Sequence, residues 1–238
     1  MTTTKYRTLT ALPVYNEVEH VAAVLDGALN YSDEVLVVDD GSDDGTGDVL
    51  AGRSDVQVWT HPRNLGYGAA LRSAFAFAAD HRYDVLVTID CDGQHQPQLI
   101  PRFLDAIAGA DIVSGSRYLR EFPGDSDAPQ QRRRINEALT AELNRRLGMQ
   151  LTDAFCGFKA YRVPILAKFA LTETGYAMPL EMWVQAARLG LRIVEVAVPR
   201  IYLDERRSFG GSLDHAETRL DVYRRVLDRV IAAAGGCP

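Results

Sequence analysis

The sequence contains few cysteines, no long apolar run and no excess of positive charge, and each of these shortages excludes a class of protein. Its 238 residues include three cysteines, Cys91, Cys156 and Cys237. These are too few and too scattered for a disulfide framework or a zinc site, and they predict a reducing, cytoplasmic location. The first residues show no signal-peptide pattern, and no apolar stretch approaches a membrane span. The net charge of −6 argues against a nucleic-acid partner.

The remaining composition is that of an ordinary globular protein, with 47% hydrophobic and 24% charged residues. The length suits one large α/β domain, and the sequence shows no repeat and no low-complexity linker. Strands and helices alternate through the first half, which predicts a parallel sheet with right-handed crossovers. The expected strands are 6–12 (broken by Pro13), 34–39, 56–60, 85–89 and 111–114, and the expected helices are 18–29, 43–50 (capped by Ser42 or Asp43), 69–79 and 97–108.

Three polar clusters follow strands of this predicted sheet, at residues 13–17, 39–40 and 90–94. Because ligands of such sheets bind beyond the carboxyl ends of the strands, the clusters predict one site at one edge. Asp90 and Asp92 end a buried apolar strand, where two neighbouring carboxylates repel each other and are costly to desolvate. A divalent cation would neutralise them, and a phosphorylated substrate would complete its coordination shell.

The second half of the chain is less regular. Residues 121–131 are rich in proline, aspartate and glutamine and form a candidate lid. Three arginines, 132–134, then begin a helix that runs to Leu147, although cations are disfavoured at a helix N-terminus unless an anion lies nearby. Further expected elements are a helix at 179–190, a strand at 193–198, a basic loop at 206–211 and a terminal helix from Asp214. The terminal helix is expected to dock on the domain, while its arginines (219, 224, 225 and 229) would also attract acidic lipid head groups.

Five short motifs occur in a characteristic order: Pro13-Val-Tyr-Asn-Glu17, Val38-Asp-Asp-Gly-Ser42, Asn64-Leu-Gly-Tyr-Gly68, Asp90-Cys-Asp-Gly-Gln-His95 and Ser114-Gly-Ser-Arg-Tyr118. This series resembles the family 2 glycosyltransferases of the GT-A fold, especially the dolichol- or polyprenyl-phosphate mannose and glucose synthases. Asp153–Tyr161 resembles a further segment of those enzymes. The resemblance implies an α/β GT-A domain over residues 1–238 with a central, mostly parallel sheet flanked by helices. Within it, 1–118 would bind the nucleotide sugar, 119–213 would face the acceptor, and 214–238 would be a terminal helix.

The resemblance also implies roles for particular residues. The nucleotide would be held by Pro13, Tyr15, Glu17, Asp39, Asp40, Gly66, Asp90 and Cys91. Mg²⁺ or Mn²⁺ would be bound by Asp90, Asp92 and Gln94. Catalysis would involve Asp92, Arg117, Arg132, Asp153 and Glu181. The acceptor or its phosphate would contact Arg117, Arg132, Lys159, Arg207 and Ser212. Which of the arginines 132–134 faces the site is open. One departure from the family stands at Leu213, where relatives carry a lysine.

The implied reaction moves a hexose from a GDP- or UDP-sugar to a polyprenyl phosphate with inversion. A divalent ion and arginine would stabilise the leaving nucleoside diphosphate. A hydroxyl acceptor would need a carboxylate base such as Asp153 or Glu181, whereas an anionic phosphate needs none. The sequence leaves open the sugar, the base, the oligomeric state and a small soluble acceptor in place of the lipid. Alternatives from other classes are a catalytically idle sugar-nucleotide-binding module and a haloacid-dehalogenase-like phosphatase.

Overall fold

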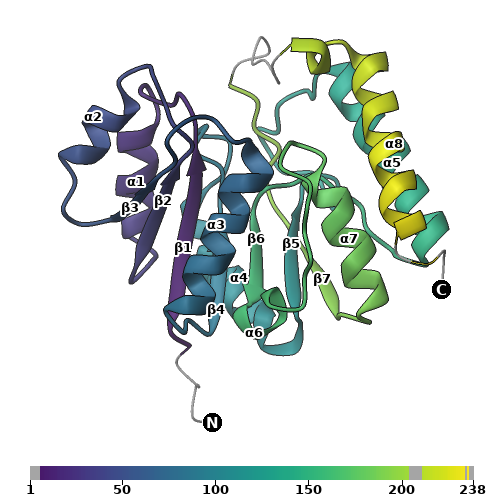
Figure 1. Ribbon diagram of the computed structural model, residues 1–238, viewed down its shortest axis with the longest axis horizontal. Coiled ribbons are helices and arrows are strands. Elements are labelled where there is room, and N and C mark those ends of the chain that lie inside the picture. The colour runs from purple at the N-terminus through teal and green to yellow at the C-terminus, as the bar shows by residue number, and fades with distance from the viewer. Residues whose placement is uncertain (1–5, 204–210, 234, 236–238) are drawn as a thin grey trace.

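A single sheet with the strand order β3-β2-β1-β4-β6-β5-β7 forms the centre of the molecule. The computed structural model describes residues 6–203, 211–233 and 235 (Figure 1). The strands are β1 (Thr8–Val14), β2 (Val35–Asp39), β3 (Gln57–Thr60), β4 (Val85–Thr88), β5 (Ile112–Ser116), β6 (Lys159–Arg162) and β7 (Ile193–Ala197). Neighbouring strands pair in parallel except at β6, which runs antiparallel to both β4 and β5. The predicted α/β class with a mostly parallel sheet is therefore confirmed.

Helices cover both faces of this sheet (Figure 1). The helices are α1 (Val21–Leu29), α2 (Thr46–Ala51), α3 (Tyr67–Asp80), α4 (Ile100–Ala106), α5 (Gln130–Leu147), α6 (Val163–Leu166), α7 (Met178–Arg188) and α8 (Ala216–Ala233), with short 3₁₀ turns at Pro97–Leu99, Ile107–Gly109 and Gly211–Asp214. One hydrophobic core joins the sheet to α3, α6 and α7, and extends to α5 and α8. A second core on the opposite face joins the sheet to α1, α2 and α4. No helix in the described part of the chain is long and apolar enough to span a membrane.

Strand β2 shows how the sequence specifies this sandwich. Leu36 and Val38 point into the first core, whereas Val35 and Val37 point into the second. Because successive side chains of a strand face opposite sides, a strand covered on both faces needs an unbroken apolar run. In β3, at the edge of the sheet, every residue is exposed.

The structure corrects three details of the sequence prediction. Pro13 does not break β1. It pairs with Val38 of β2 at a point where β4 has already ended, so the N–H that proline lacks is not needed for pairing with β4. Neither Ser42 nor Asp43 caps α2; instead Asp44 Oδ1 accepts hydrogen bonds from the backbone N–H and the hydroxyl of Thr46. The antiparallel strand β6 was not predicted at all.

The candidate lid at 121–131 is tied to the segment that follows β7. The Ser126 N–H donates to the Arg200 carbonyl at 2.7 Å, and the Arg200 N–H donates to Asp125 Oδ1 at 2.8 Å. The Tyr202 N–H donates to Ser126 Oγ at 3.2 Å. These bonds fix one position of the segment; its ordering over a bound donor stays a prediction.

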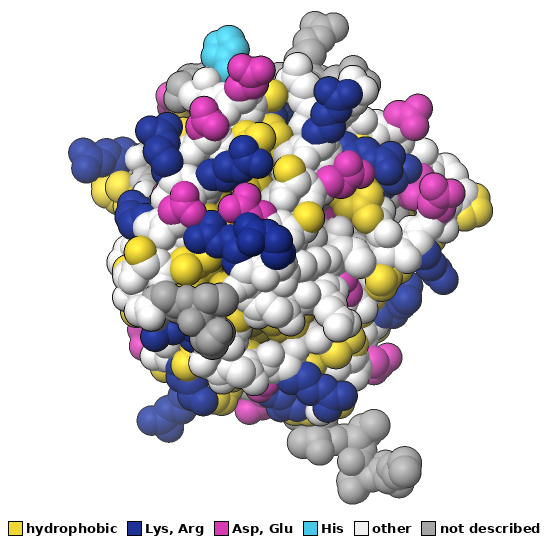
Figure 2. Space-filling model, turned by 90° about the vertical axis from the view of Figure 1, so that its right-hand side faces the viewer, with side chains coloured by type: hydrophobic (Ala, Val, Ile, Leu, Met, Phe, Trp, Pro, Cys, Tyr) yellow, Lys and Arg dark blue, Asp and Glu magenta, His cyan; other side chains and the backbone are white. Residues whose placement is uncertain are grey.

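Helix α8 docks on the domain, as the sequence predicted, with Tyr223, Leu227 and Ile231 in the first core. Its cations do not form a uniformly basic surface. Arg224 Nε lies 3.4 Å from Glu142 Oε2, and Arg229 Nη2 lies 2.6 Å from Glu173 Oε2. On this side of the molecule arginine side chains alternate with carboxylates (Figure 2). Two of the four α8 arginines named in the sequence analysis thus pair with carboxylates of other segments, and attraction of this helix to acidic lipids stays a prediction.

Candidate active site

A cavity of about 1060 Å³ opens beyond the carboxyl ends of β1, β2 and β4, and extends to α5, α7 and α8. It is lined by most of the residues that the sequence assigned to a site: Pro13, Tyr15, Glu17, Asp40, Gly66, Asp90, Cys91, Asp92, Gln94, Arg117, Arg132 and Lys159. Asp39, Asp153 and Glu181 do not line it. Arg207 and the side chain of Ser212 lie outside the described part of the chain. The fold thus gathers residues from both halves of the sequence around one space.

The loop after β1 forms one wall of the cavity and is held by the loop after β2. Asn16 has a φ of 56°, in the left-handed region. Its side chain exchanges hydrogen bonds with Asp43, since Asn16 Nδ2 donates to Asp43 Oδ1 and the Asp43 N–H donates to Asn16 Oδ1, both at 2.9 Å. The N–H of Glu17, a buried residue, donates to the Thr46 hydroxyl at 2.9 Å. Tyr15, which directly precedes these anchors, is 41% exposed.

The two aspartates after β2 hold loops. Asp39 Oδ1 accepts from the Ser42 N–H and hydroxyl at 3.0 and 2.6 Å. Asp40 accepts from the Gly66 N–H at 2.8 Å, from the Leu65 N–H at 2.9 Å and from His61 Nδ1 at 2.6 Å. Gly66 has a φ of 104°, and a side chain there would collide with the Thr174 carbonyl. Asp40 therefore positions the loop that leads into α3, which brings the next residue, Tyr67, to the cavity.

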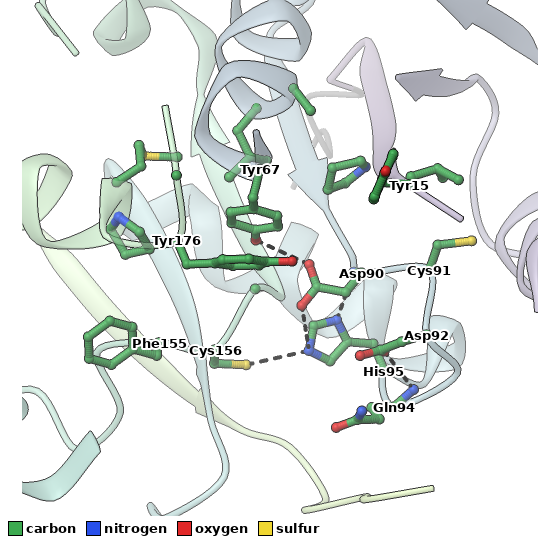
Figure 3. A pocket seen from close by; sticks show the side chains of 18 of the residues that line it. Tyr15, Tyr67, Asp90, Cys91, Asp92, Gln94, His95, Phe155, Cys156 and Tyr176 are labelled. Carbon is green, nitrogen blue, oxygen red and sulfur yellow. Dashed lines mark hydrogen bonds and ion pairs between the residues drawn. The ribbon is translucent and has the colours of Figure 1, made fainter. Parts of the chain in front are cut away.

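Asp90 and Asp92 lie at the centre of the cavity wall (Figure 3). The Tyr67 hydroxyl donates to Asp90 Oδ1 at 3.1 Å, and the Asp90 N–H donates to His95 Nδ1 at 2.9 Å. Asp92 Oδ1 accepts from the Gln94 N–H at 3.0 Å. Burial raises the pKa of both carboxyls, and the charge of Asp90 raises that of Asp92 further. Two desolvated carboxylates side by side are therefore unfavourable unless a cation joins them.

This carboxylate pair fits a hard divalent cation. Mg²⁺ and Mn²⁺ prefer oxygen ligands and are commonly held by one or two carboxylates together with substrate phosphates. The amide oxygen of Gln94 offers a third ligand from the same loop. In the described part of the chain no group of three or more His, Cys, Asp and Glu side chains is arranged to hold a metal. The pair Asp90 and Asp92 suits an ion that takes the rest of its coordination from a bound substrate.

The backbone of Gly157 makes room for Asp90. A Cβ built on Gly157 would overlap the Asp90 carboxylate. The same segment carries Cys156, whose sulfur lies 3.9 Å from His95 Nε2. Burial lowers the pKa of His95 to about 4, and the Asp92 charge opposes this shift only partly. At neutral pH His95 is a neutral ring that accepts the Asp90 N–H, and it adds no charge to the site.

Arg117 faces the cavity and is fixed from behind by Asp153. Asp153 is fully buried, with Arg117 Nε at 2.7 Å from its Oδ2 and Arg117 Nη2 at 3.0 Å from its Oδ1. Asn136 Nδ2 also donates to Asp153 Oδ1, at 2.7 Å. Burial opposes ionisation of Asp153, but Arg117 and these hydrogen bonds together leave its pKa lowered. Asp153 therefore positions Arg117. The resemblance implied that Asp153 lies on the sugar or acceptor side, but its side chain does not line the cavity.

Among the three arginines at the start of α5, Arg132 is the one that lines the cavity. Arg133 is exposed and pairs with Glu137 at 2.8 Å, and Arg134 is also exposed. The structure thereby resolves the choice that the sequence left open. On β6, the buried ammonium of Lys159 donates to the Cys156 carbonyl. Burial lowers the pKa of Lys159, while the nearby Cys156, Asp153 and Asp90 oppose that shift.

Glu181, in the first turn of α7, is buried away from the cavity. Its carboxylate accepts from the Thr172 N–H at 2.8 Å, the Thr172 hydroxyl at 2.9 Å and the Glu173 N–H at 2.7 Å. These contacts hold the turn that precedes α7. The implied position on the sugar or acceptor side is not where the structure places this residue.

Sequence reasoning missed several residues of the cavity. Tyr67 stacks on Tyr176 with ring centroids 5.6 Å apart, and Figure 3 shows both rings beside Asp90. Tyr67 lies inside a motif that the sequence singled out, so a signal for it existed. Tyr176 and the α8 residues Arg219 and Tyr223 also line the cavity. Packing between distant segments brings these residues to the cavity, and no local sequence pattern predicts such packing.

Comparison with known proteins agrees with this geometry. Residues 10–169 match the family model for glycosyl transferase family 2. An undecaprenyl-phosphate mannosyltransferase of Micrococcus luteus is 38% identical over 224 residues, which cover 88% of this chain and 90% of that protein. A polyprenol monophosphomannose synthase of Mycolicibacterium smegmatis is 36% identical over 206 residues, which cover 81% of this chain and 76% of that protein.

Solved structures support the same fold. A glucosyl-3-phosphoglycerate synthase from Mycobacterium tuberculosis in complex with uridine-diphosphate superposes with a TM-score of 0.72 at 22% identity, covering 98% of this chain and 82% of that one. The architecture is accordingly the GT-A fold. The family match removes both the phosphatase and the idle binding module from the alternatives. The chain belongs to glycosyl transferase family 2 and is a glycosyltransferase.

Proposed function

We propose that this enzyme transfers a hexosyl group, with inversion, from a nucleoside-diphosphate sugar to the phosphate of a polyprenyl phosphate. The observation that carries the proposal is that carboxylates and arginines line one cavity. Asp90 and Asp92 line it together with Arg117 and Arg132. A metal-bound diphosphate suits the carboxylates, and an anionic acceptor suits the arginines.

The names of the relatives favour a lipid-linked acceptor. Both relatives described above carry an undecaprenyl or polyprenol acceptor in their names. Each covers more than three quarters of this chain, including the segments that supply Arg117, Arg132 and Lys159. The donor base remains either guanine or uracil in this proposal. We place the reaction at the cytoplasmic surface of a membrane, which the enzyme contacts transiently.

Asp90, Asp92 and Gln94 would hold Mg²⁺ or Mn²⁺. In support, a related glucosyl-3-phosphoglycerate synthase was crystallised with Mn²⁺ and uridine-diphosphate, and it shares the fold at a TM-score of 0.70. Such an ion, when bound, stabilises the negative charge that develops on the leaving diphosphate. Tyr67, Gly157 and His95 fix the position of Asp90, so the ligand geometry is prepared before the substrate arrives.

The remaining chemistry falls to the arginines. Arg117 is held as a rigid fork by Asp153 and faces the cavity, where it can bind phosphate oxygens of the donor or the acceptor. Asp153 and Glu181, the two carboxylates considered as general bases, are buried outside the cavity and accept hydrogen bonds from the protein. An acceptor phosphate is already anionic and needs no such base. The loss of these two candidates therefore favours a phosphate over a hydroxyl acceptor.

A comparison of acceptors tests the proposal. The purified protein, Mn²⁺ and a panel of GDP- and UDP-hexoses would be incubated with a polyprenyl phosphate, the matching polyprenol, or a small phosphorylated acid in detergent. We expect sugar transfer to the polyprenyl phosphate and none to the polyprenol. Transfer to the small phosphorylated acid alone would show that the acceptor is a soluble phosphate ester, and transfer to the polyprenol would show that a base exists elsewhere.

A further inference from the structure

Helices α5 and α8 lie side by side and run in the same direction (Figure 1). Two ion pairs define how the helices are aligned. Arg224 Nε of α8 lies 3.4 Å from Glu142 Oε2 of α5, and Arg146 Nη1 of α5 lies 2.6 Å from Asp228 Oδ1 of α8. Both helices therefore begin at the same end, which is the cavity end. Each carries an arginine in its first turn that lines the cavity, Arg132 on α5 and Arg219 on α8.

Arg219 is unusual for a helical arginine because it is only 4% exposed. Its Nη1 donates to the Leu213 carbonyl at 2.8 Å. Burial lowers the pKa of this guanidinium, Tyr223 and Asp214 oppose the shift, and the charge of Arg132 adds to it. The first turn of a helix favours anions over cations, so two arginines that line the cavity there suit an anionic ligand.

Aromatic and aliphatic side chains line the same cavity as this pair of arginines. Phe155 and Tyr223 stack with ring centroids 5.5 Å apart, and both line the cavity together with Met182. Tyr176 also lines the cavity; the charges of Asp90 and Asp92 add to the rise that burial causes in its pKa, and Arg132 opposes it. One cavity therefore holds the two carboxylates, the two arginines and these aromatic and aliphatic side chains.

We propose that Arg219, together with Arg132, binds the phosphate of the acceptor, so that α8 forms the acceptor end of the active site. The ligand chemistry is a phosphate monoester, carried by a polyprenyl chain or by a small soluble molecule. The aromatic and aliphatic side chains of the cavity suit the first units of a polyprenyl chain. This inference rests on the proposed function and adds a residue to it. Arg219 also places a cation next to Leu213, the position at which relatives carry a lysine.

Direct binding measurements test this assignment without relying on turnover. Wild-type protein, Arg219→Gln and Arg219→Lys would be titrated calorimetrically with three probes: farnesyl phosphate, glycerol 3-phosphate, and a nucleoside diphosphate with Mn²⁺. Arg225→Gln serves as the matched control, since Arg225 is an exposed arginine of the same helix outside the cavity. Thermal melting of each variant reports whether α8 stays docked.

We expect Arg219→Gln to weaken binding of farnesyl phosphate by about tenfold or more, the usual loss for a hydrogen bond to a charged group. Binding of the nucleoside diphosphate with Mn²⁺ should stay at the wild-type value. Arg219→Lys keeps the charge but loses the planar fork, and an intermediate affinity is expected. If Arg219→Gln fails to fold, Arg219→Lys must by itself show weaker binding of the phosphate monoester with unchanged binding of the nucleoside diphosphate.

The contrary results are distinct from a failure of the proposed function. Equal farnesyl phosphate affinity in wild-type, Arg219→Gln and Arg219→Lys proteins would overturn the role of Arg219 while leaving transfer to polyprenyl phosphate intact. Selective loss for glycerol 3-phosphate, with no farnesyl phosphate binding by the wild type, would keep Arg219 as a phosphate ligand and overturn the lipid acceptor. Wild-type binding of the nucleotide but of neither monoester would overturn both.

Discussion

Replacing Asp153 by asparagine removes the negative charge that holds Arg117 in place. The two residues make a bidentate pair with distances of 2.7 and 3.0 Å, and Asp153 is fully buried while the Arg117 side chain is 18% exposed. Breaking one partner of a buried pair leaves an uncompensated charge and costs about 3–5 kcal/mol. In a domain of this size, that loss lowers the melting temperature by about 6–20 °C.

The effect on stability should depend on pH in a particular direction. Because the pKa of Asp153 is lowered in the folded protein, its contribution is fully present above the unfolded value of about 3.9. It is lost as the pH falls through the folded value. The stability difference between wild type and Asp153→Asn should therefore be constant at neutral pH and shrink on acidification below about pH 4.

Urea unfolding from pH 7 down to the acid limit of the wild type, combined with steady-state kinetics at low temperature, would measure both effects. Glu137→Gln is the matched control, since it breaks an exposed pair with Arg133 and should cost about 1 kcal/mol or less. In the folded fraction of Asp153→Asn we expect a lower kcat because Arg117 loses its fixed orientation. Wild-type kcat per folded molecule, or a destabilisation no larger than that of Glu137→Gln, would refute the positioning role.

Three other predictions concern the rest of the site. Asp92→Asn should nearly abolish turnover and weaken Mn²⁺-dependent donor binding without lowering the melting temperature; wild-type activity at equal metal concentration would show that the metal binds elsewhere. Gly157→Ala should displace the Asp90 carboxylate and weaken Mn²⁺ binding, measured by electron paramagnetic resonance, by about 10- to 100-fold, whereas Gly52→Ala should have no effect. Residues 121–131 should gain protection from hydrogen exchange when donor and metal bind, and unchanged exchange would count against a lid.

The part of the site that could be predicted from the sequence is the part built at strand ends. Asp90 and Asp92 follow a buried apolar run, and the carboxyl ends of parallel strands share one edge. The sheet therefore brings Asp90, Asp92 and the 13–17 loop into one cavity, as the pattern indicated. Strand β6 escaped prediction because Lys159–Arg162 is short and begins and ends with a cation. Its Lys159 is nevertheless buried among groups from distant segments.

The part that could not be predicted depends on contacts between remote segments. Asp153 and Glu181 both carry carboxylates in a suggestive context, yet one binds Arg117 and the other binds the backbone at Thr172 and Glu173. Arg219 reads as one cation among several on an amphipathic helix. Only the packing of α8 beside α5 shows that this arginine, unlike Arg225, lies in the cavity. The roles of Asp153, Glu181 and Arg219 depend on the residues that they contact, and the tertiary structure determines those contacts.

Sugar transfer itself is the measurement that tests the central claim most directly. The protein would be incubated with a labelled nucleoside-diphosphate hexose, polyprenyl phosphate and Mn²⁺, and the lipid product analysed by mass spectrometry and by NMR of the anomeric proton. We predict a hexosyl polyprenyl phosphodiester of inverted anomeric configuration, formed with stoichiometric release of the nucleoside diphosphate and abolished by chelation of the metal. Release of the nucleoside diphosphate with the sugar transferred only to water or to soluble molecules would contradict the account.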